Sequence, residues 1–184
     1  MIDMMKNFFR RIYYRAYLKR HNVFLHKSTT FKGKIIFAID DSSDVKIGDG
    51  FFCEGGVLEK PCSKFVAQKN SCLEIGRNCF VFNSVIWCAD QITIGDGVKI
   101  LSDCMIMDTD FHSLDWRIRM TPEDCKKRKT KPIKIGNEVT IESGCIIGKG
   151  IEIGDNCLIK ANSVVTKNVP NDEIWEGNPA VRVK

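Results

Sequence analysis

A six-residue repeat dominates the second half of this 184-residue chain. From residue 135 onward, an aliphatic side chain opens each of six successive units. These opening residues are Ile135, Ile141, Ile147, Ile153, Ile159 and Val165. The same register recurs upstream, where it starts from Ile47, Ile75 and Ile94. A period of six fits neither an amphipathic helix nor a plain alternating strand, so it indicates a short strand and a tight corner, repeated many times.

Three such units predict one triangular turn of a column, in which successive turns stack as parallel strands about 4.8 Å apart. The first residue of each unit is expected to point inward. The fifth is expected to point inward beside a corner, and small or medium side chains occupy it. Four of the nine cysteines hold this position: Cys79, Cys104, Cys145 and Cys157. We interpret them as buried side chains that share one structural slot, in preference to a thiol ladder for a metal ion.

The composition is that of a globular protein, with 43% hydrophobic and 28% charged residues. The chain shows no apolar run long enough to span a bilayer and no signal-peptide pattern, and its odd number of cysteines does not resemble a disulfide framework. We therefore expect a cytoplasmic protein. The absence of a C-x-x-C pair argues against a cysteine zinc site, and the basic runs lack the interleaved aromatic residues of a nucleic-acid platform.

The repeat suggests three parts: a basic helical segment at 1–30, an all-β solenoid at 31–170 and a tail at 171–184. Residues 59–74 interrupt the register, and we expect irregular strands there that still stack. Residues 113–132 interrupt it again as a long loop. Residues 4–24 are expected to form a basic helix, which either caps the open end of the column or contacts a membrane surface.

Several motifs resemble the hexapeptide-repeat acyltransferases, and more narrowly the small sugar and polysaccharide O-acetyltransferases. They are the tandem units, the segment Asp108-Thr109-Asp110-Phe111-His112 before an inserted loop, and the ending Val164-Val165-Thr166-Lys167 with Gly177-Asn178-Pro179-Ala180. This resemblance implies a left-handed parallel β-helix that assembles as a homotrimer. It also implies acetyl-CoA as acyl donor and, as acceptor, a carbohydrate of a surface polysaccharide or lipopolysaccharide pathway.

His112 is the candidate catalytic residue. Transfer of an acetyl group from a thioester to a hydroxyl needs a base, and imidazole has a suitable pKa. Of the three histidines, only His112 lies at the edge of the repeat. The resemblance implies direct transfer with His112 as general base. The alternatives are a surface histidine in an acidic turn, or a metal site with Asp108 and Asp110; without a second repeat-borne histidine we expect no metal.

The acceptor-binding candidates are four polar residues near the His112 turn. Asp108 and Asp110 have two interpretations of equal weight: they orient His112 or bind acceptor hydroxyls, or they form corners of the column. Asn83 and Asp90 precede that turn, and the resemblance implies that they contact the acceptor. Asn83 is equally well explained as an ordinary corner residue.

The resemblance also implies a groove between two columns that holds coenzyme A. By motif position its contacts are Ser143, Ala161, Thr166, Lys167 and Arg182, with Lys167 meeting a phosphate as a point charge. A backbone amide near Ser143–Gly144 is a candidate donor to the oxyanion. Small residues at Ser143 and Ala161 are also what any tight corner needs. Thr140 occupies a position where many relatives have tryptophan, which bears on the acceptor more than on the fold.

Two other functions compete with O-acetyl transfer. One is N-acetylation of a nucleotide-linked amino sugar, because an amine needs less help from a base than a hydroxyl does. The other is a non-catalytic β-helix scaffold, which predicts no affinity for coenzyme A.

Overall fold

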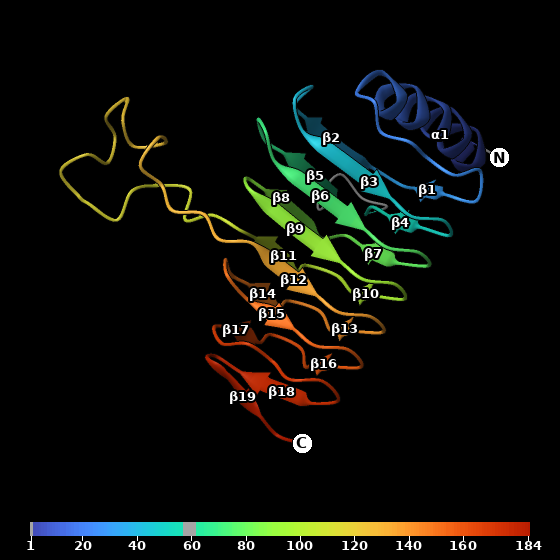
Figure 1. The fold of residues 1–184 in the computed structure, drawn as a ribbon. Helices are drawn as coiled ribbons and strands as arrows, with labels where there is room; N and C mark the ends of the chain where they lie inside the picture. The colour runs from blue at the N-terminus through green and yellow to red at the C-terminus, as the bar shows by residue number, and fades with distance from the viewer. Residues whose placement is uncertain (1, 57–61) are drawn as a thin grey trace.

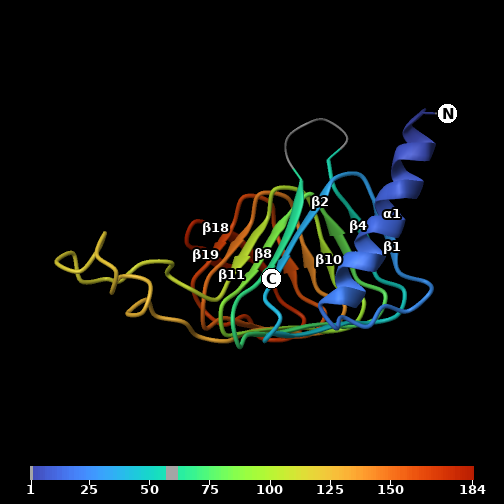
Figure 2. The same ribbon diagram turned by 90° about the horizontal axis from the view of Figure 1, so that it is seen from above.

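The computed structural model describes residues 2–56 and 62–184, which form a three-sided column built from three sheets (Figures 1 and 2). The eight-stranded sheet contains β1 (Thr30–Lys32), β4 (Phe52–Glu54), β7 (Phe80–Phe82), β10 (Lys99–Ile100), β13 (Thr140–Ile141), β16 (Leu158–Ile159), β18 (Ile174–Gly177) and β19 (Ala180–Arg182). The six-stranded sheet contains β2 (Ile35–Ile39), β5 (Ser63–Ala67), β8 (Val85–Cys88), β11 (Met105–Met107), β14 (Ile146–Ile147) and β17 (Val164–Val165). The five-stranded sheet contains β3 (Asp44–Ile47), β6 (Cys72–Ile75), β9 (Gln91–Ile94), β12 (Ile133–Ile135) and β15 (Glu152–Ile153).

The chain visits the three sheets in turn, so each coil adds one parallel strand to each sheet. Thr140 of β13 pairs with Leu158 of β16, three six-residue units later, as the repeat predicts. Within the interrupted stretch at 59–74, the described residues from 63 onward also stack: β5 pairs in register with β2, and β6 with β3. These strands are regular, contrary to the expectation of irregular ones. Residues 57–61 lie outside the described part of the chain, and among them is Val57, which the six-residue register from Ile47 places at a fifth position.

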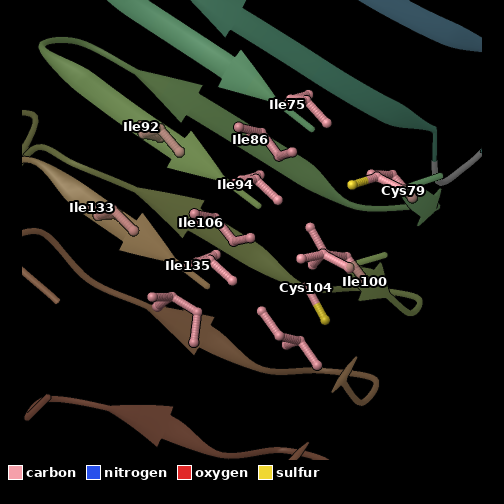
Figure 3. Packing of buried hydrophobic residues seen from close by; sticks show 14 of the residues in the cluster. Ile75, Cys79, Ile86, Ile92, Ile94, Ile100, Cys104, Ile106, Ile133 and Ile135 are labelled. Carbon is pink, nitrogen blue, oxygen red and sulfur yellow. The ribbon is translucent and has the colours of Figure 1, made fainter. Parts of the chain in front are cut away.

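The interior of the column is a set of stacked isoleucines (Figure 3). Ile86, Ile106 and Ile147 occupy the same place on successive coils, and none of the three is exposed to solvent. Each such side chain contributes about 1.5–3 kcal/mol by its removal from water. From Ile94 onward, the first residue of each repeat unit therefore supplies the core, as the sequence predicts. The register that starts from Ile75 predicts Trp87 and Val85 inside the column, and this is wrong: Ile86 is buried there, while Trp87 and Val85 face outward.

The four repeat cysteines point inward but lie along two corners of the column, not one. Cys104 and Cys145 are directly stacked at the corner where the eight-stranded sheet leads into the six-stranded sheet, while Cys79 and Cys157 lie at another corner with Val98 and Val139 between them. Each thiol donates to a backbone carbonyl of the following coil, at sulfur–oxygen distances of 2.9–3.1 Å: Gly95, Glu142, Lys160 and Pro170. The cysteines therefore tie neighbouring coils together.

Helix α1 (Ile2–Arg20) covers the N-terminal end of the column (Figure 1). Its Tyr14 packs against Phe31 and Phe37, and its Leu18 is fully buried. The helix ends as a Schellman motif: the Val23 amide donates to the Leu18 carbonyl, and Asn22 has a φ of 59°. The capping role expected for this segment is confirmed.

Residues 171–184 continue the column as β18 and β19, which form an antiparallel hairpin at its C-terminal end. Trp175 of β18 is buried there. Among the described residues, no helix is both long and apolar enough to cross a membrane.

Candidate active site

The loop at 108–132 joins β11 to β12 and projects away from the column (Figures 1 and 2). Its two ends are tied together at the column surface, where the Lys131 amide donates to the Asp108 carbonyl and the Asp110 amide to the Lys129 carbonyl, both at 3.0 Å. The predicted loop therefore leaves from the corner between the six-stranded and five-stranded sheets.

His112 forms a dyad with Asp124, which lies twelve residues later in the same loop. The distance between His112 Nδ1 and Asp124 Oδ2 is 2.7 Å. The other carboxylate oxygen, Oδ1, accepts the Ser113 amide at 2.6 Å, and Asp124 is only 4% exposed. The carboxylate that orients the imidazole is therefore Asp124. Asp108 and Asp110, which the sequence offered as residues that orient His112, do not contact the ring.

The protonation of the dyad follows from its contacts. The Ser113 amide, and after it the imidazole, hold the pKa of Asp124 below its usual range, so this carboxylate is ionised at neutral pH. An ionised carboxylate can only accept, so Nδ1 of His112 carries the proton and donates it to Asp124. This leaves the lone pair on Nε2, on a side chain that is 64% exposed. The arrangement is that of a general base that faces solvent.

Asp110 forms an ion pair with a residue of the next coil. Its Oδ1 lies 2.6 Å from Nζ of Lys149, and both side chains are largely buried. The other carboxylate oxygen of Asp110 is buried without a hydrogen-bond partner among the described residues. The pair lies at the base of the loop, where it holds Asp110 beside the corner that follows β14.

Asp108 is a corner residue. It is fully buried, and its two carboxylate oxygens accept the amides of Ala89 and Asp90 at 2.7 and 2.8 Å. Burial raises the pKa of Asp108, although these amides oppose the shift. A carboxylate enclosed in this way does not face an acceptor, so the corner-forming interpretation describes it. Asp90 is exposed on the preceding coil and accepts the Thr130 hydroxyl at 3.3 Å.

The remaining candidates divide between the two edges of the six-stranded sheet. One edge, defined here as the first corner, joins this sheet to the eight-stranded sheet and carries Asn83, Ser143 and Ala161. The other edge, the second corner, joins it to the five-stranded sheet and carries Thr166 and Lys167, in line with the base of the loop. One chain therefore presents two sets of candidates, separated by the width of a sheet.

At the first corner the polar groups are engaged within the chain. Asn83 is buried with a φ of 48° and donates to Asp103 at 3.2 Å, so it serves as a corner residue. The Ala161 amide donates to Glu142 at 2.9 Å. The Gly144 amide donates to the Ser102 carbonyl at 2.8 Å and is not available for an oxyanion. Ser143 keeps its hydroxyl at the surface, 3.1 Å from that of Ser102.

At the second corner, Thr166 lines a groove of about 430 Å³ together with Phe111, Gly148 and Lys149. A smaller hollow of about 300 Å³ lies beside His112 and is lined by Leu114, Arg119, Met120 and Asp124. Arg182 lies away from both, on the terminal hairpin, where it pairs with Glu173 at 3.1 Å. Within one chain, Thr166 is thus the predicted donor contact nearest to the base of the His112 loop.

The outer face of the six-stranded sheet, between the two corners, is largely apolar. Its outward side chains include Ile36, Val85, Trp87, Met105, Met107, Ile146 and Val164. The indole nitrogen of Trp87 is buried without a hydrogen-bond partner in the described part of the chain. The outer face of the five-stranded sheet, in contrast, carries mostly charged and polar side chains such as Asp44, Lys46 and Glu74.

Comparison with known proteins places this geometry in a family. Residues 132–167 match the family model described as bacterial transferase hexapeptide (six repeats). Over 108 residues the chain is 37% identical to galactoside O-acetyltransferase from Escherichia coli strain K12, an alignment that covers 58% of this chain and 51% of that protein. The chain thus spans about half the length of this curated relative.

Two solved structures extend the comparison. A hexapeptide-repeat-containing acetyltransferase from Vibrio cholerae, complexed with acetyl coenzyme A, superposes with a TM-score of 0.57 at 26% identity, covering 85% of this chain and 70% of that one. An N-acyltransferase from Bacillus cereus, in complex with dTDP and 3-hydroxybutyryl-CoA, gives a TM-score of 0.65 at 18% identity and covers 92% and 87%. The latter likeness concerns the fold alone.

Residues 132–167 carry the bacterial transferase hexapeptide repeat, and the chain is similar to hexapeptide-repeat acetyltransferases. Its structural neighbours are left-handed β-helix proteins, and its column is the left-handed parallel β-helix that the resemblance implied. Handedness is a property that the six-residue period alone does not encode, because general crossover preference is right-handed.

Two residues of the candidate site were missed in the sequence. Asp124 lies in a loop without periodicity, so nothing in the pattern shows that the chain folds back onto His112. Lys149 follows Gly148 at a repeat corner, and its place directly above the loop base follows from the stacking of consecutive coils. Its position could have been predicted by following the repeat from Asp110 to the same corner of the next coil.

Proposed function

We propose that this chain is an acetyl-CoA-dependent O-acetyltransferase that acetylates a sugar hydroxyl, with His112 as general base. The observation that carries this proposal is the His112–Asp124 dyad, whose 2.7 Å contact directs the unprotonated Nε2 away from its carboxylate partner. A base oriented in this way suits proton abstraction from a hydroxyl, a group that is a weak nucleophile until it is deprotonated.

In the proposed reaction, His112 Nε2 accepts the hydroxyl proton while the hydroxyl oxygen forms a bond to the thioester carbonyl carbon. Asp124 stabilises the resulting imidazolium through Nδ1–H. The carbon–sulfur bond then breaks, and His112 returns the proton to the departing sulfur. The acetyl group passes directly to the acceptor, and no acyl-enzyme forms.

The groove at the second corner supports binding of the donor. Thr166 lines it, and Lys167 lies at the same corner, where a cation suits a phosphate of coenzyme A. Lys149 also lies there, but its charge is already paired with Asp110. At the first corner the Ala161 and Gly144 amides are engaged within the chain, so the support there is the small side chains of Ser143 and Ala161, which leave room for an extended arm. We place the reacting thioester near the base of the 108–132 loop, because His112 and Thr166 both approach that position.

Exposed apolar side chains on the loop and on the six-stranded sheet support assembly as a homotrimer. The loop at 108–132 projects beyond its own column, and Leu114, Trp116 and Met120 on it are 61%, 76% and 94% exposed. The apolar outer face of the six-stranded sheet lies between the two corners that carry the donor candidates. Packing of this face against a neighbouring column would bring the first corner of one chain toward the second corner of another. Each site would then be built from two chains.

We place the acceptor among carbohydrates, with a surface polysaccharide or lipopolysaccharide precursor as the specific proposal. The Escherichia coli relative is named a galactoside O-acetyltransferase, which supports a sugar hydroxyl as the acceptor group. N-acylation of a nucleotide-linked amino sugar is the competing reaction. The dyad favours the hydroxyl, because a neutral amine is already a nucleophile and gains less from a base.

Calorimetry with coenzyme A, followed by steady-state assays with acetyl-CoA, tests this function. Sugars and glycans that carry free hydroxyls are compared with nucleotide-linked amino sugars as acceptors. We expect coenzyme A binding and turnover with hydroxyl acceptors that falls at least a hundredfold in His112→Ala. Cys125→Ser, an exposed neighbour of the dyad, is the matched control. Absence of coenzyme A binding would instead support a scaffold, and exclusive use of amines would support N-acylation.

A further inference from the structure

Helix α1 has two apolar faces, and the column uses only one. Tyr14 and Leu18 point into the first coil and are buried. On the opposite side of the helix, five large side chains are 52–63% exposed: Met5, Phe8, Phe9, Ile12 and Tyr13. Their spacing of three and four residues places them on a single stripe. We call this stripe the outer face of α1. The capping of the column therefore leaves the outer face unexplained.

The charge around the outer face has one sign. Between Asp3 and Asp40 the sequence contains no acidic residue. It contains nine basic residues over the same interval: Lys6, Arg10, Arg11, Arg15, Lys19, Arg20, Lys27, Lys32 and Lys34. Of these, Arg15 is used internally, because its guanidinium donates to the carbonyls of residues 26, 27 and 29. Lys6, Arg11, Lys19 and Arg20 are exposed along the helix.

An apolar stripe flanked by basic side chains indicates which kind of surface binds the outer face. Aromatic and aliphatic side chains flanked by cations match the boundary between the headgroups and the acyl chains of an anionic bilayer, where a helix lies in the plane of the surface. A second copy of the same face is disfavoured, because pairing two such stripes brings cations against cations. The helix is too short in apolar length to span the bilayer, so contact is confined to the interface.

We propose that α1 docks this protein onto an anionic lipid surface through its outer face, while its inner face caps the column. The two roles considered for this segment are then compatible, because they use opposite sides of one helix. Phe8, Phe9 and Ile12 enter the interface, and Lys6 and Arg20, each seven residues from Tyr13 and exposed, bind lipid phosphates beside them. Docking requires no change in the column, since every residue that it uses is exposed in the capped state.

The test measures partition of the full-length protein onto vesicles by co-sedimentation. Vesicles of phosphatidylcholine alone are compared with vesicles that also contain phosphatidylglycerol. We expect binding only to the anionic vesicles, with loss on raising the salt concentration. The double variant Phe8→Ser/Phe9→Ser should weaken partition by about tenfold or more, because the apolar anchor is removed. Lys6→Gln/Arg20→Gln should weaken it by about fivefold per cation.

Val181→Ser/Val183→Ser is the matched control, since these two valines are 58% and 56% exposed at the far end of the column. It should partition like the unaltered protein. Thermal unfolding and light scattering are recorded for every variant. Absence of binding to anionic vesicles, or equal binding by both double variants and the unaltered protein, would overturn the proposal. So would a drop in oligomeric mass in Phe8→Ser/Phe9→Ser, which would assign the outer face to contact between chains.

Discussion

Replacing Asp124 by asparagine tests the dyad most directly, because it preserves the shape of the side chain and replaces one acceptor oxygen by an NH₂ donor. Both carboxylate oxygens receive donors: the Ser113 amide at 2.6 Å and His112 Nδ1 at 2.7 Å. An asparagine has one acceptor and one donor end. If its oxygen keeps the Ser113 amide, its NH₂ group faces Nδ1, which must then accept. The proton moves to Nε2, and the base is lost.

The opposite orientation of the asparagine is also unfavourable, because its NH₂ group would meet the Ser113 N–H at a nearly buried position. An aspartate-to-asparagine change of this kind in a hydrolase triad lowers kcat by about 10⁴. The His112 side chain is 64% exposed, so water competes for Nδ1 and softens the effect. We therefore expect Asp124→Asn to lower kcat by roughly 10²–10³.

The assay is steady-state turnover with acetyl-CoA and a sugar acceptor, with KM for acetyl-CoA and the thermal unfolding midpoint measured in parallel. The fall is expected in kcat, while KM for the donor stays within about twofold because Asp124 does not line the Thr166 groove. Asp124→Glu keeps two acceptor oxygens and should retain more activity than Asp124→Asn. If Asp124→Asn keeps over half of the original kcat while His112→Ala is inactive, Asp124 does not set the tautomer, and the proposed role is wrong.

Two further predictions concern the column and the effect of pH. Ile106→Ala should lower the free energy of unfolding by about 2–5 kcal/mol, because it opens a cavity between two fully buried isoleucines. Denaturant unfolding measures this, and the control is Lys134→Ala on the exposed face of the five-stranded sheet, which should change little. The pKa of Asp124 is lower in the folded protein than in the unfolded chain, so its ionised form stabilises the folded loop. This stabilisation should be complete above the ordinary aspartate pKa of about 3.9 and should be lost as the pH falls through the lower pKa of the folded state. Amide hydrogen exchange at residues 112–124 follows this loss, and protection that is independent of pH across the acid range would contradict it.

The column was predictable because its sequence period encodes its geometry directly. Each unit places one side chain inward, so the buried isoleucines follow from position alone, as Ile106 and Ile147 illustrate. The period also locates the loop, because a chain that leaves the register at Ser113 and rejoins it at Ile133 must bulge from one corner. Which corner a unit occupies is not encoded in the same way. Each coil has three units and three corners, so the corner that a residue occupies depends on which of the three units contains it. The fifth-position cysteines belong to two different units of their coils and therefore lie along two corners.

The candidate site was only partly predictable, because its decisive contact lies in the loop. His112 could be selected from its place at the edge of the repeat, but its partner depends on how an aperiodic segment folds back. Asp108 and Asp110 are nearer in sequence and were the natural choices. The structure uses Asp108 to close a corner and pairs Asp110 with Lys149, so proximity along the chain gave the wrong partner.

The position of the loop explains how a rigid repeat can carry a variable site. The coil before the loop and the coil after it are both complete, so the loop leaves and returns between fixed hydrogen-bonding groups. The Lys131 amide bonds back to Asp108, and the Gly150 amide of the following coil donates to the Lys131 carbonyl at 3.1 Å. Changes in length or sequence between residues 113 and 129 therefore leave both anchors in place. Because Asp124 and the exposed Trp116 and Met120 lie in that interval, directly after the proposed base His112, we expect this segment to set the proposed acceptor choice while the column and the Thr166 groove remain constant.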